Sequence, residues 1–473
     1  MLVSPPTLLE ERFEAQRQAF ALEPCPSERV RVDRLNRLLA MIETQGAEFA
    51  RCIDADFGGR SSNETRLAEL FIVRSGIRHA RAHLRAWMRP QRVSTSLHFR
   101  PAYNRLVRQP LGVVGVVSPW NYPLQLSLGP ALAALAAGNR VLLKPSELTP
   151  NFAALLDQVV RAAFSPDELS VVNGDVEVGQ AFVGLPFDHL FFTGSTQVGR
   201  QVAQAAAANL TPVTLELGGK SPAILDASCS IRTAAKSIAF GKLMNAGQTC
   251  IAPDYLLVPK GRANDVAHEL ETAIKRLYPV LIANPDYTSI ISVRHRERLA
   301  AMVQEAQDSG ARIVTVNPSG EVFDEHTRKF PPTLVIGAAP NTRLMREEIF
   351  GPLLPIVEYD GLDHAIAMVN QRDRPLALYW FGLNAANRDR VLTETVSGGV
   401  TVNDCLWHLA QEAQPFGGVG PSGTGAYHGE WGFRTFSKEK PVFYQARLNG
   451  TALFHPPYGK TFELMLGLLK RIT

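Results

Sequence analysis

The strongest constraint on the fold is a series of short apolar runs that alternate with alanine- and leucine-rich segments in the middle of the chain. The apolar runs are 112–117, 140–143, 169–173, 189–193 and 212–217. Continuous apolar strands are typical of a parallel sheet covered on both faces, and the segments between them are suited to crossover helices. This part of the chain is therefore predicted to fold as a doubly wound, Rossmann-like α/β lobe.

A second alternating series begins at Ser221 and continues to about Phe416, which predicts a second α/β lobe. Two lobes also agree with the length of 473 residues, because a single core stops growing near about 250–300 residues. The N-terminal part has apolar residues at helical spacing, and residues 93–108 have the alternation of a strand pair. The expected fold class is α/β, with two doubly wound parallel-sheet lobes and a small β element for oligomerisation.

The changes of pattern also suggest where the domains begin and end. The expected parts are a cofactor-binding domain with the N-terminal helices (1–92 and 109–217), a catalytic domain (218–416), an oligomerisation or bridging element (93–108 and 417–448) and a C-terminal tail (449–473). Within the bridging element, residues 442–446 are predicted to form a strand that pairs with the hairpin of residues 93–108.

The charge and cysteine content argue against several classes of protein. The net charge of +4 comes from 49 basic and 45 acidic residues, and no basic run is interleaved with aromatic residues, so a nucleic-acid partner is not expected. Neither a signal-type N-terminus nor a transmembrane stretch is recognisable, which predicts a cytoplasmic protein. The five cysteines are scattered and lack CxxC spacing, so neither a disulfide framework nor a metal site is expected.

Cys250 lies in a loop that contains a glycine, just beyond a predicted helix that covers 231–244. Most lone cysteines are buried and behave as small apolar residues. A glycine-bearing loop differs because it lets a substrate approach the thiol closely, and dipoles near a loop thiol can lower its pKa from about 8.5. The backbone N–H of Cys250 could also face a developing oxyanion.

Two further polar residues stand at the ends of predicted strands. Glu216 lies where an apolar strand runs into the pair Gly218–Gly219, and a carboxyl held near neutrality in such a place is suited to act as a general base. The alternative is a structural carboxylate that caps the glycine turn. Asn121 lies after the strand 112–117 and could donate to a developing alkoxide, although Asn is also common near turn prolines for conformational reasons.

A glycine turn from Gly194 to Gly199 joins the strand 189–193 to an alanine-rich helix. Such a turn presents backbone N–H groups and the positive end of a helix to a phosphate. Its G-x-x-x-x-G spacing differs from the usual dinucleotide fingerprint, and tight strand–helix packing is an equally good explanation. Lys144 and Glu147 follow the strand 140–143 and could both bind ribose hydroxyls, or they could lie on a solvated surface.

Taken together, these segments resemble the motif set of the aldehyde dehydrogenase superfamily and occur in the family's order. The motifs are PWNYP at 119–123, KPSE at 144–147, FTGS at 192–195, LELGGK at 215–220, GQTC at 247–250, EEIFGP at 347–352 and PFGG at 415–418. Within the superfamily the chain resembles the short, class 3-like branch, and stretches such as 185–189 and 372–379 are most similar to coniferyl aldehyde dehydrogenases.

The resemblance implies a role for each matching residue. Cys250 would attack the aldehyde, Asn121 and the Cys250 amide would hold the oxyanion, and Glu216 would activate the water that hydrolyses the thioester. NAD would be the preferred cofactor and NADP would be tolerated. The implied cofactor-binding residues are Trp120, Lys144, Glu147, Gly194, Ser195, Thr196, Gln197, Val198, Gly199, Leu217, Glu348 and Phe350.

The family pattern also implies the substrate and the assembly. The implied substrate pocket consists of Tyr122, Phe240, Met244, Thr249, Ile251 and His408. Coniferyl aldehyde, oxidised to ferulate, is the expected substrate, and the main alternative is a broad specificity for medium- and long-chain aliphatic aldehydes. A coenzyme A-acylating enzyme is disfavoured because such enzymes generally lack the hydrolytic glutamate, and an inactive structural relative is disfavoured by the intact motif residues. The resemblance further implies a homodimer.

Overall fold

A six-stranded sheet forms the centre of the first lobe in the computed structural model, which describes residues 5–324 and 327–472. Its strands, in spatial order, are β15 (Gly423–Thr424), β7 (Val213–Glu216), β6 (His189–Thr193), β3 (Val113–Val117), β4 (Arg140–Lys144) and β5 (Leu169–Val171). Strands β7, β6, β3, β4 and β5 run parallel, as expected from their continuously apolar sequences.

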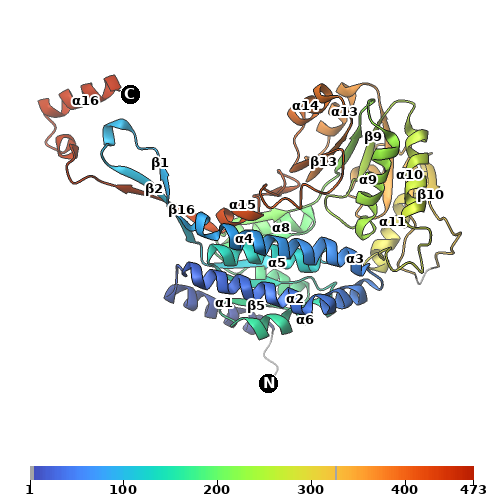
Figure 1. Cartoon of the computed structure of the whole chain (residues 1–473), viewed down its shortest axis with the longest axis horizontal. Helices are drawn as coiled ribbons and strands as arrows, with labels where there is room; N and C mark the ends of the chain where they lie inside the picture. The colour runs from blue at the N-terminus through green and yellow to red at the C-terminus, as the bar shows by residue number, and fades with distance from the viewer. Residues whose placement is uncertain (1–4, 325–326, 473) are drawn as a thin grey trace.

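Helices cover both faces of this sheet, and successive strand residues alternate between the two cores. Val114 and Val116 pack into one hydrophobic cluster, whereas Val113 packs into the other. Figure 1 shows several of these helices stacked below the second lobe. The helices of this lobe are α1 (Pro5–Leu22), α2 (Glu28–Phe57), α3 (Ser62–Thr65), the π-helical turn η1 (Arg66–Phe71), α4 (Ile72–Met88), α5 (Pro123–Ala137), α6 (Pro150–Ala163), α7 (Val176–Val183), α8 (Thr196–Ala207) and α15 (Gly429–Thr435).

The second lobe contains a seven-stranded sheet that is also buried on both faces (Figure 1). Its strands, in spatial order, are β10 (Arg312–Thr315), β11 (Thr333–Ile336), β12 (Leu353–Tyr359), β9 (Tyr255–Pro259), β8 (Pro222–Leu225), β13 (Ala377–Phe381) and β14 (Gly399–Val402). The helical segments of this lobe are α9 (Ile231–Leu243), the short turn η3 (Met244–Gly247), α10 (Ala263–Leu277), α11 (Val293–Asp308), α12 (Arg343–Arg346), α13 (Leu362–Asn370) and α14 (Ala385–Glu394).

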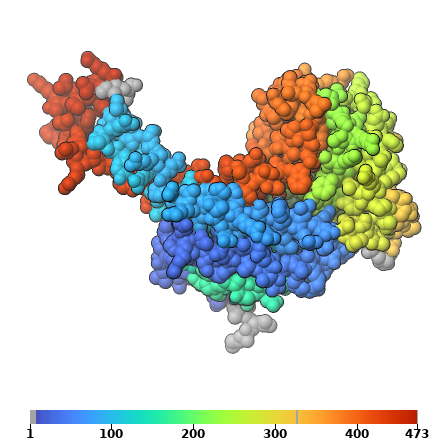
Figure 2. Space-filling view, in the orientation of Figure 1, coloured from blue at the N-terminus to red at the C-terminus, as the bar shows by residue number. Residues whose placement is uncertain are grey.

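A three-stranded antiparallel sheet forms an arm that stands away from both lobes (Figure 2). It consists of β1 (Gln91–Val93), β2 (Tyr103–Pro110) and β16 (Ser437–Tyr444). The predicted return of a C-terminal strand to the hairpin is confirmed, although β16 begins five residues before residue 442. The arm also carries η2 (Leu97–Phe99), η4 (Thr451–Phe454) and α16 (Lys460–Ile472), and no described helix is long and apolar enough to cross a membrane.

The predicted fold class is confirmed, but two edge strands depart from the expected parallel arrangement. Strand β10 pairs antiparallel with β11, and the short strand β15 pairs antiparallel with β7. An edge strand has a neighbour on one side only, so it can reverse direction without disturbing the parallel core, and mixed sheets of this kind are common. Helix α7 was not predicted from the sequence. It is only eight residues long, and Asp175 caps it by accepting from Glu177 N and Val178 N.

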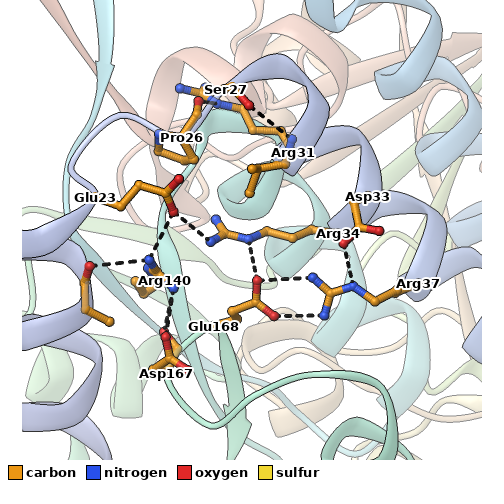
Figure 3. Close-up of polar contacts among 12 residues, drawn as sticks. Glu23, Pro26, Ser27, Arg31, Asp33, Arg34, Arg37, Arg140, Asp167 and Glu168 are labelled. Atoms are coloured by element: carbon orange, nitrogen blue, oxygen red, sulfur yellow. Dashed lines mark hydrogen bonds and ion pairs between the residues drawn. The ribbon is translucent and has the colours of Figure 1, made fainter.

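A buried network of arginines joins helix α2 to the six-stranded sheet (Figure 3). Arg34, whose side chain is 1% exposed, pairs with Glu168 at 3.0 Å, and Arg37 pairs with the other oxygen of the same carboxylate at 2.8 Å. Arg140, at the start of β4, pairs with Asp167 at 3.1 Å. Since Asp167 and Glu168 lie directly before β5, these ion pairs fix α2 against the edge of the sheet.

We predict that replacing Glu168 destabilises the fold in a pH-dependent way. Burial by itself would raise the pKa of the Glu168 carboxyl, but hydrogen bonds from Arg37 and Arg34 lower it to about 2. An unfolded glutamate titrates near ~4.3, so the ionised carboxylate stabilises the fold above about pH 4.3, and this stabilisation is lost as the pH falls towards 2. Glu168→Gln should lower the free energy of unfolding by about 1–3 kcal/mol at pH 7.

Urea unfolding of both proteins at pH 7, together with melting temperatures between pH 8 and pH 4, measures this effect. The gap between wild type and Glu168→Gln should be constant from pH 8 to about pH 6 and should narrow as the unfolded glutamate becomes protonated near ~4.3. Equal stability of the two proteins at pH 7 would show that the network does not stabilise the fold.

Candidate active site

Cys250 lies at an apolar cavity between the two lobes, which we call the inner cavity. The turn η3 that leads to it contains three successive residues with left-handed backbone, Asn245, Ala246 and Gly247, with φ of 53°, 52° and 76°. A Cβ on Gly247 would lie 2.3 Å from the carbonyl oxygen of Gly351, so only glycine fits there. Left-handed backbone at non-glycine residues is strained and occurs most often at functional sites. The turn directs the chain from α9 into the wall of the inner cavity.

The environment of the Cys250 thiol differs from the expectation drawn from the sequence. The loop was expected to lower the pKa of the thiol, but burial raises it to about 12, and the carboxyls of Glu348 and Glu216 add to the effect. The expectation was wrong because it considered only the dipoles of the loop itself. Folding brings two acidic side chains and an apolar wall to the sulfur, and both favour the neutral thiol.

Glu216 lies at the end of β7 and also lines the inner cavity. Its side chain is buried, with a relative exposure of 2%, and neither carboxylate oxygen has a hydrogen-bond partner among the described residues. Burial therefore raises its pKa well above the usual value for a glutamate. A carboxylate that capped the glycine turn would accept from backbone N–H groups, so the structural alternative is not supported.

Asn121 connects the first lobe to the loop of Cys250. Its side-chain nitrogen donates to the carbonyl oxygen of Gln248 at 3.1 Å, and its own carbonyl accepts from the Asn245 side chain at 3.0 Å. The side chain is buried. Because an amide nitrogen carries two protons, one N–H of Asn121 remains to donate to another group at this loop.

The structure places most of the expected substrate residues in the wall of the inner cavity. Tyr122, Phe240, Met244, Thr249 and Ile251 all line it, and the Tyr122 hydroxyl lies 2.7 Å from Thr249 Oγ1.

His408 is not among the lining residues of the inner cavity, which departs from the expectation. Its Nδ1 lies 2.7 Å from Thr401 Oγ1, and its ring stacks on Phe416, so it packs behind the wall that its neighbour Trp407 helps to form.

Several residues of this wall were not identified from the sequence. They come from segments far apart in the chain, and they include Leu67, Phe71, Leu126, Leu406, Trp407, Phe416 and Tyr427. Apart from Phe416, which belongs to the PFGG motif, no local pattern distinguishes them. The only other sequence signal was the proximity of Leu406 and Trp407 to the implied His408.

A second depression, which we call the surface cleft, lies at the carboxyl ends of β3, β4 and β6. The expected cofactor residues that line it are Trp120, Lys144, Glu147, Gly194, Ser195 and Val198. Ligands of open α/β sheets bind at this edge. The Ser195 hydroxyl caps helix α8 by accepting from Val198 N at 3.3 Å, so the N-terminus of a 12-residue helix opens into the cleft.

Lys144 gives an independent indication that the surface cleft suits an anionic or hydroxyl-rich ligand. Its side chain is buried, with a relative exposure of 3%, and its ammonium donates to the carbonyl of Pro145 at 2.9 Å. Burial lowers its pKa. An ammonium has three donors, so Lys144 retains donors for ribose hydroxyls, and the residues present fit a dinucleotide.

The remaining expected cofactor residues do not line the surface cleft. Thr196 donates to the Pro421 carbonyl at 3.1 Å, Gln197 is exposed on the first turn of α8, and Gly199 allows close contact with Leu217, which lies in the inner cavity. A Cβ on Gly199 would lie 2.6 Å from Leu217 Cδ2. Gly199 therefore serves strand–helix packing, which was the alternative explanation of the glycine turn.

Glu348 and Phe350 lie between the cleft and the inner cavity. The Glu348 carboxylate lies directly over Gly218, where a Cβ would come within 2.3 Å of both oxygens. Burial raises its pKa to about 8, and Asp254 adds to the effect. The Phe350 ring meets Trp120 edge-on, with 5.4 Å between the ring centroids. Glu348 thus lies near Cys250, and Phe350 lies next to a residue that lines the cleft.

The cleft also contains residues of the second lobe that the sequence did not suggest. They are Arg294, His295 and Arg298 of α11 and Arg343 of α12. The His295 ring meets Trp120 edge-on at 5.3 Å. Over the parts of the chain that the structure describes, no group of three or more His, Cys, Asp or Glu residues is placed to hold a metal ion. The site is thus a thiol and carboxyl cavity next to a cleft that suits a dinucleotide.

Comparison with known proteins identifies the family of this chain. Residues 10–442 match the aldehyde dehydrogenase family. A Pseudomonas aeruginosa protein named "Probable coniferyl aldehyde dehydrogenase" is 49% identical over 97% of this chain and 95% of its own length. The substrate-bound Staphylococcus aureus AldH superposes with a TM-score of 0.91 at 38% identity, over 97% of this chain and 99% of that one.

A further solved structure is an aldehyde dehydrogenase variant of Pseudomonas syringae in complex with NAD⁺ and octanal. It has a TM-score of 0.84 and 29% identity, and the match covers 94% of this chain and 90% of that one. The relatives and the family match extend over nearly the whole sequence, which confirms the resemblance found in the motifs. The chain belongs to the aldehyde dehydrogenase family and is an oxidoreductase that acts on an aldehyde with a nicotinamide cofactor.

Proposed function

We propose that this enzyme oxidises coniferyl aldehyde to ferulate with NAD, through a covalent intermediate on Cys250. The observation that carries this proposal is that a thiol, Cys250, and a buried carboxyl without a hydrogen-bond partner, Glu216, line the same apolar cavity. Thr193 lines both this inner cavity and the surface cleft, so a cofactor in the cleft reaches the edge of the cavity.

In the proposed mechanism, the Cys250 thiol gives its proton to solvent water as its sulfur attacks the aldehyde carbon, and the product is the oxyanion form of a thiohemiacetal. The free N–H of Asn121 and the backbone N–H of Cys250 donate to the resulting oxyanion. The nicotinamide ring supplies the hydride acceptor when NAD is bound. The thioester left on Cys250 is hydrolysed by a water from which Glu216 removes a proton, and the raised pKa of Glu216 suits this task near neutral pH.

The same proposal assigns the cofactor residues. Lys144 and Glu147 hold the adenine ribose, Trp120 and the turn from Gly194 to Ser195 lie on the pyrophosphate side, and Glu348 with Phe350 holds the nicotinamide ribose and ring. A carboxylate next to the ribose favours the free 2′-hydroxyl of NAD over the phosphate of NADP. Glu147 is exposed at the rim of the cleft, where solvent weakens this repulsion, so NADP should be tolerated.

The choice of coniferyl aldehyde is supported by the cavity wall and by the relative of Pseudomonas aeruginosa. Phe240 and Trp407 stack at 6.5 Å with 17° between their planes, and both rings line the cavity. Medium- and long-chain aliphatic aldehydes are the second candidate, because the wall is almost entirely apolar and extends to the exposed residues Leu67 and Phe71. An apolar pocket discriminates by only about 1–3 kcal/mol per methylene.

We further propose a cytoplasmic homodimer in which a second copy packs on the arm. The arm presents apolar side chains to solvent, among them Leu97, Phe99 and Phe443, and Figure 2 shows that neither lobe of the same chain covers it. We also propose the domain limits expected from the sequence. They fall at residues 92/93, 108/109, 217/218, 416/417 and 448/449.

Two substitutions test the covalent mechanism. Cys250→Ala should remove at least about 99.9% of aldehyde-dependent NADH formation, since triad-type nucleophiles contribute at least about 10³-fold. Glu216→Gln should still form NADH in a burst of about one equivalent per site and should then stall at the thioester. Rapid mixing with absorbance at 340 nm measures both. A normal steady-state rate in either variant would assign that role to another residue.

The raised pKa of the Cys250 thiol predicts how it reacts with an alkylating reagent. The thiolate is the nucleophile, and below the thiol's pKa of about 12 its fraction increases tenfold for each pH unit. In the protein without cofactor, the rate of iodoacetamide labelling at Cys250 should therefore rise steadily from pH 7 to pH 10. Peptide mass spectrometry measures the rate, with the exposed Cys25 as an internal control for the reagent. A plateau near pH 8 would contradict the structure.

A substrate panel tests the specificity. With NAD, the kcat/KM for coniferyl aldehyde should exceed that for hexanal and decanal by about 10-fold or more, because the aromatic wall adds about 1–2 kcal/mol for a planar ring. A preference for decanal would make the aliphatic candidate correct. The same panel with NADP should give lower kcat/KM values, and higher ones would exclude the proposed role of Glu147.

A further inference from the structure

The two groups proposed to hold the oxyanion come from different lobes. Asn121 follows β3 of the six-stranded sheet, whereas Cys250 follows α9 and η3 of the second lobe. Small shifts between the lobes would move the Asn121 amide away from the Cys250 loop, and a misplacement of about 1 Å can reduce a rate by about 10²-fold. The geometry therefore depends on whatever holds the two loops together.

A third segment contacts both loops. It is residues 58–71, the turn between α2 and α4, and we call it the bracing turn; it contains α3 and η1. Arg60 Nη1 donates to the carbonyl oxygen of Asn121 at 2.6 Å. The Arg60 guanidinium also lies over the Tyr122 ring, 4.9 Å from its centroid. These contacts hold both the backbone and the neighbouring ring of the Asn121 loop.

Glu69 of the bracing turn completes the contact with the first lobe. It forms a fully buried ion pair with Arg60, with 3.2 Å between Arg60 Nη2 and Glu69 Oε1. Its other oxygen accepts from Leu124 N at 2.7 Å and from Gln125 N at 3.2 Å. These N–H groups belong to the first turn of α5, where a carboxylate is stabilised by unpaired amides and by the helix dipole.

Glu64 holds the loop of the second lobe. Its Oε2 accepts from the backbone N–H of Asn245 at 3.1 Å and from the Thr288 hydroxyl at 2.7 Å. Asn245 is one of the residues with left-handed backbone before Cys250, and its side chain donates to the same Asn121 carbonyl that Arg60 binds. Arg60 and Glu64 thus approach the pair Asn121–Asn245 from the same turn.

The bracing turn is itself fastened to the second lobe. The Ser61 hydroxyl lies 3.1 Å from Asp286 Oδ1, and Ser289 N donates to the Gly59 carbonyl at 2.7 Å. Gln248, two residues before Cys250, donates to the Ser289 carbonyl at 2.9 Å. The turn, the loop that contains Ser289 and the Cys250 loop therefore form one continuous hydrogen-bonded unit.

We propose that Arg60, supported by Glu64 and Glu69, is a positioning residue for catalysis: it fixes the Asn121 loop of one lobe against the Cys250 loop of the other. The proposal rests on the roles proposed above for Asn121 and Cys250. Arg60 acts through Asn121 and Tyr122. Its planar guanidinium binds Asn121, Glu69 and the Tyr122 face at once, which a lysine ammonium cannot reproduce.

The test compares Arg60→Lys with a matched control, Arg34→Lys. Both are buried arginines of the N-terminal helical region, and each is paired with a carboxylate; Arg34 pairs with Glu168, as Figure 3 shows. We expect Arg60→Lys to reduce kcat by about 10- to 100-fold, with the dissociation constant of NAD unchanged within about twofold, since Arg60 does not line the surface cleft. Arg34→Lys should lower the melting temperature by a similar amount and leave kcat unchanged.

The measurements are steady-state kinetics, the rate of the first turnover of NADH formation, NAD binding by fluorescence, and the melting temperature. The first-turnover rate should fall in Arg60→Lys as much as kcat does, because the oxyanion forms before the hydride leaves. A wild-type kcat in Arg60→Lys would overturn the proposal. The proposal would also be overturned if Arg60→Lys and Arg34→Lys both lost kcat in proportion to the drop in their melting temperatures.

If Arg60→Lys does not fold, the double variant Arg60→Met/Glu69→Gln replaces it, because removing both buried charges together avoids an unpaired one. A wild-type kcat in the double variant, or a loss of kcat in proportion to its melting temperature as in Arg34→Lys, would then overturn the proposal. Cys250→Ala in the same assay separates the two proposals: an active Cys250→Ala enzyme would refute the covalent mechanism, whereas an inactive one together with a normal Arg60→Lys enzyme would refute only the positioning role.

Discussion

The hydrogen bond from the Asn121 side chain to the Gln248 carbonyl, at 3.1 Å, joins the two lobes where the chemistry is proposed to occur. Each lobe is built around its own sheet, and one hydrophobic cluster continues across both lobes. Apolar packing is non-directional, so short, buried, directional contacts between the loops are needed to align them. The bracing turn from Gly58 to Phe71 supplies more of these contacts on both sides, and it links the two loops through hydrogen bonds of Arg60 and Glu64.

The electrostatics of the inner cavity follow from the burial of Glu216 and Cys250 against an apolar wall. Glu216 has no hydrogen-bond partner among the described residues, and the pKa values of Glu216 and Cys250 are both raised. An apolar wall solvates anions poorly, so it disfavours the charged forms of both groups. The same burial makes the ionised Glu216 carboxylate a stronger base than an exposed glutamate, which suits it to remove a proton from a water.

The surface cleft is formed by residues of both lobes. Its floor lies at the carboxyl ends of β3, β4 and β6, whereas Arg294, His295 and Arg298 of α11 come from the second lobe. Trp120, which follows β3 of the first lobe, contacts the second lobe through the rings of His295 and Phe350. A dinucleotide in the cleft would therefore contact residues of both lobes.

The sequence by itself determined the α/β class, most strands of the two sheets, the return of β16 to the hairpin and the positions of Cys250, Glu216 and Asn121, because periodicity and short motifs are local properties of the chain. Only the tertiary structure decided the antiparallel edges β10 and β15, the position of His408 behind the wall of the inner cavity and the direction of the Cys250 pKa shift. It alone revealed the wall residues Leu67 and Trp407 and the bracing role of Arg60. Each of these depends on groups that are distant in sequence and meet only after packing, and burial and charge at a site are sums over all such neighbours.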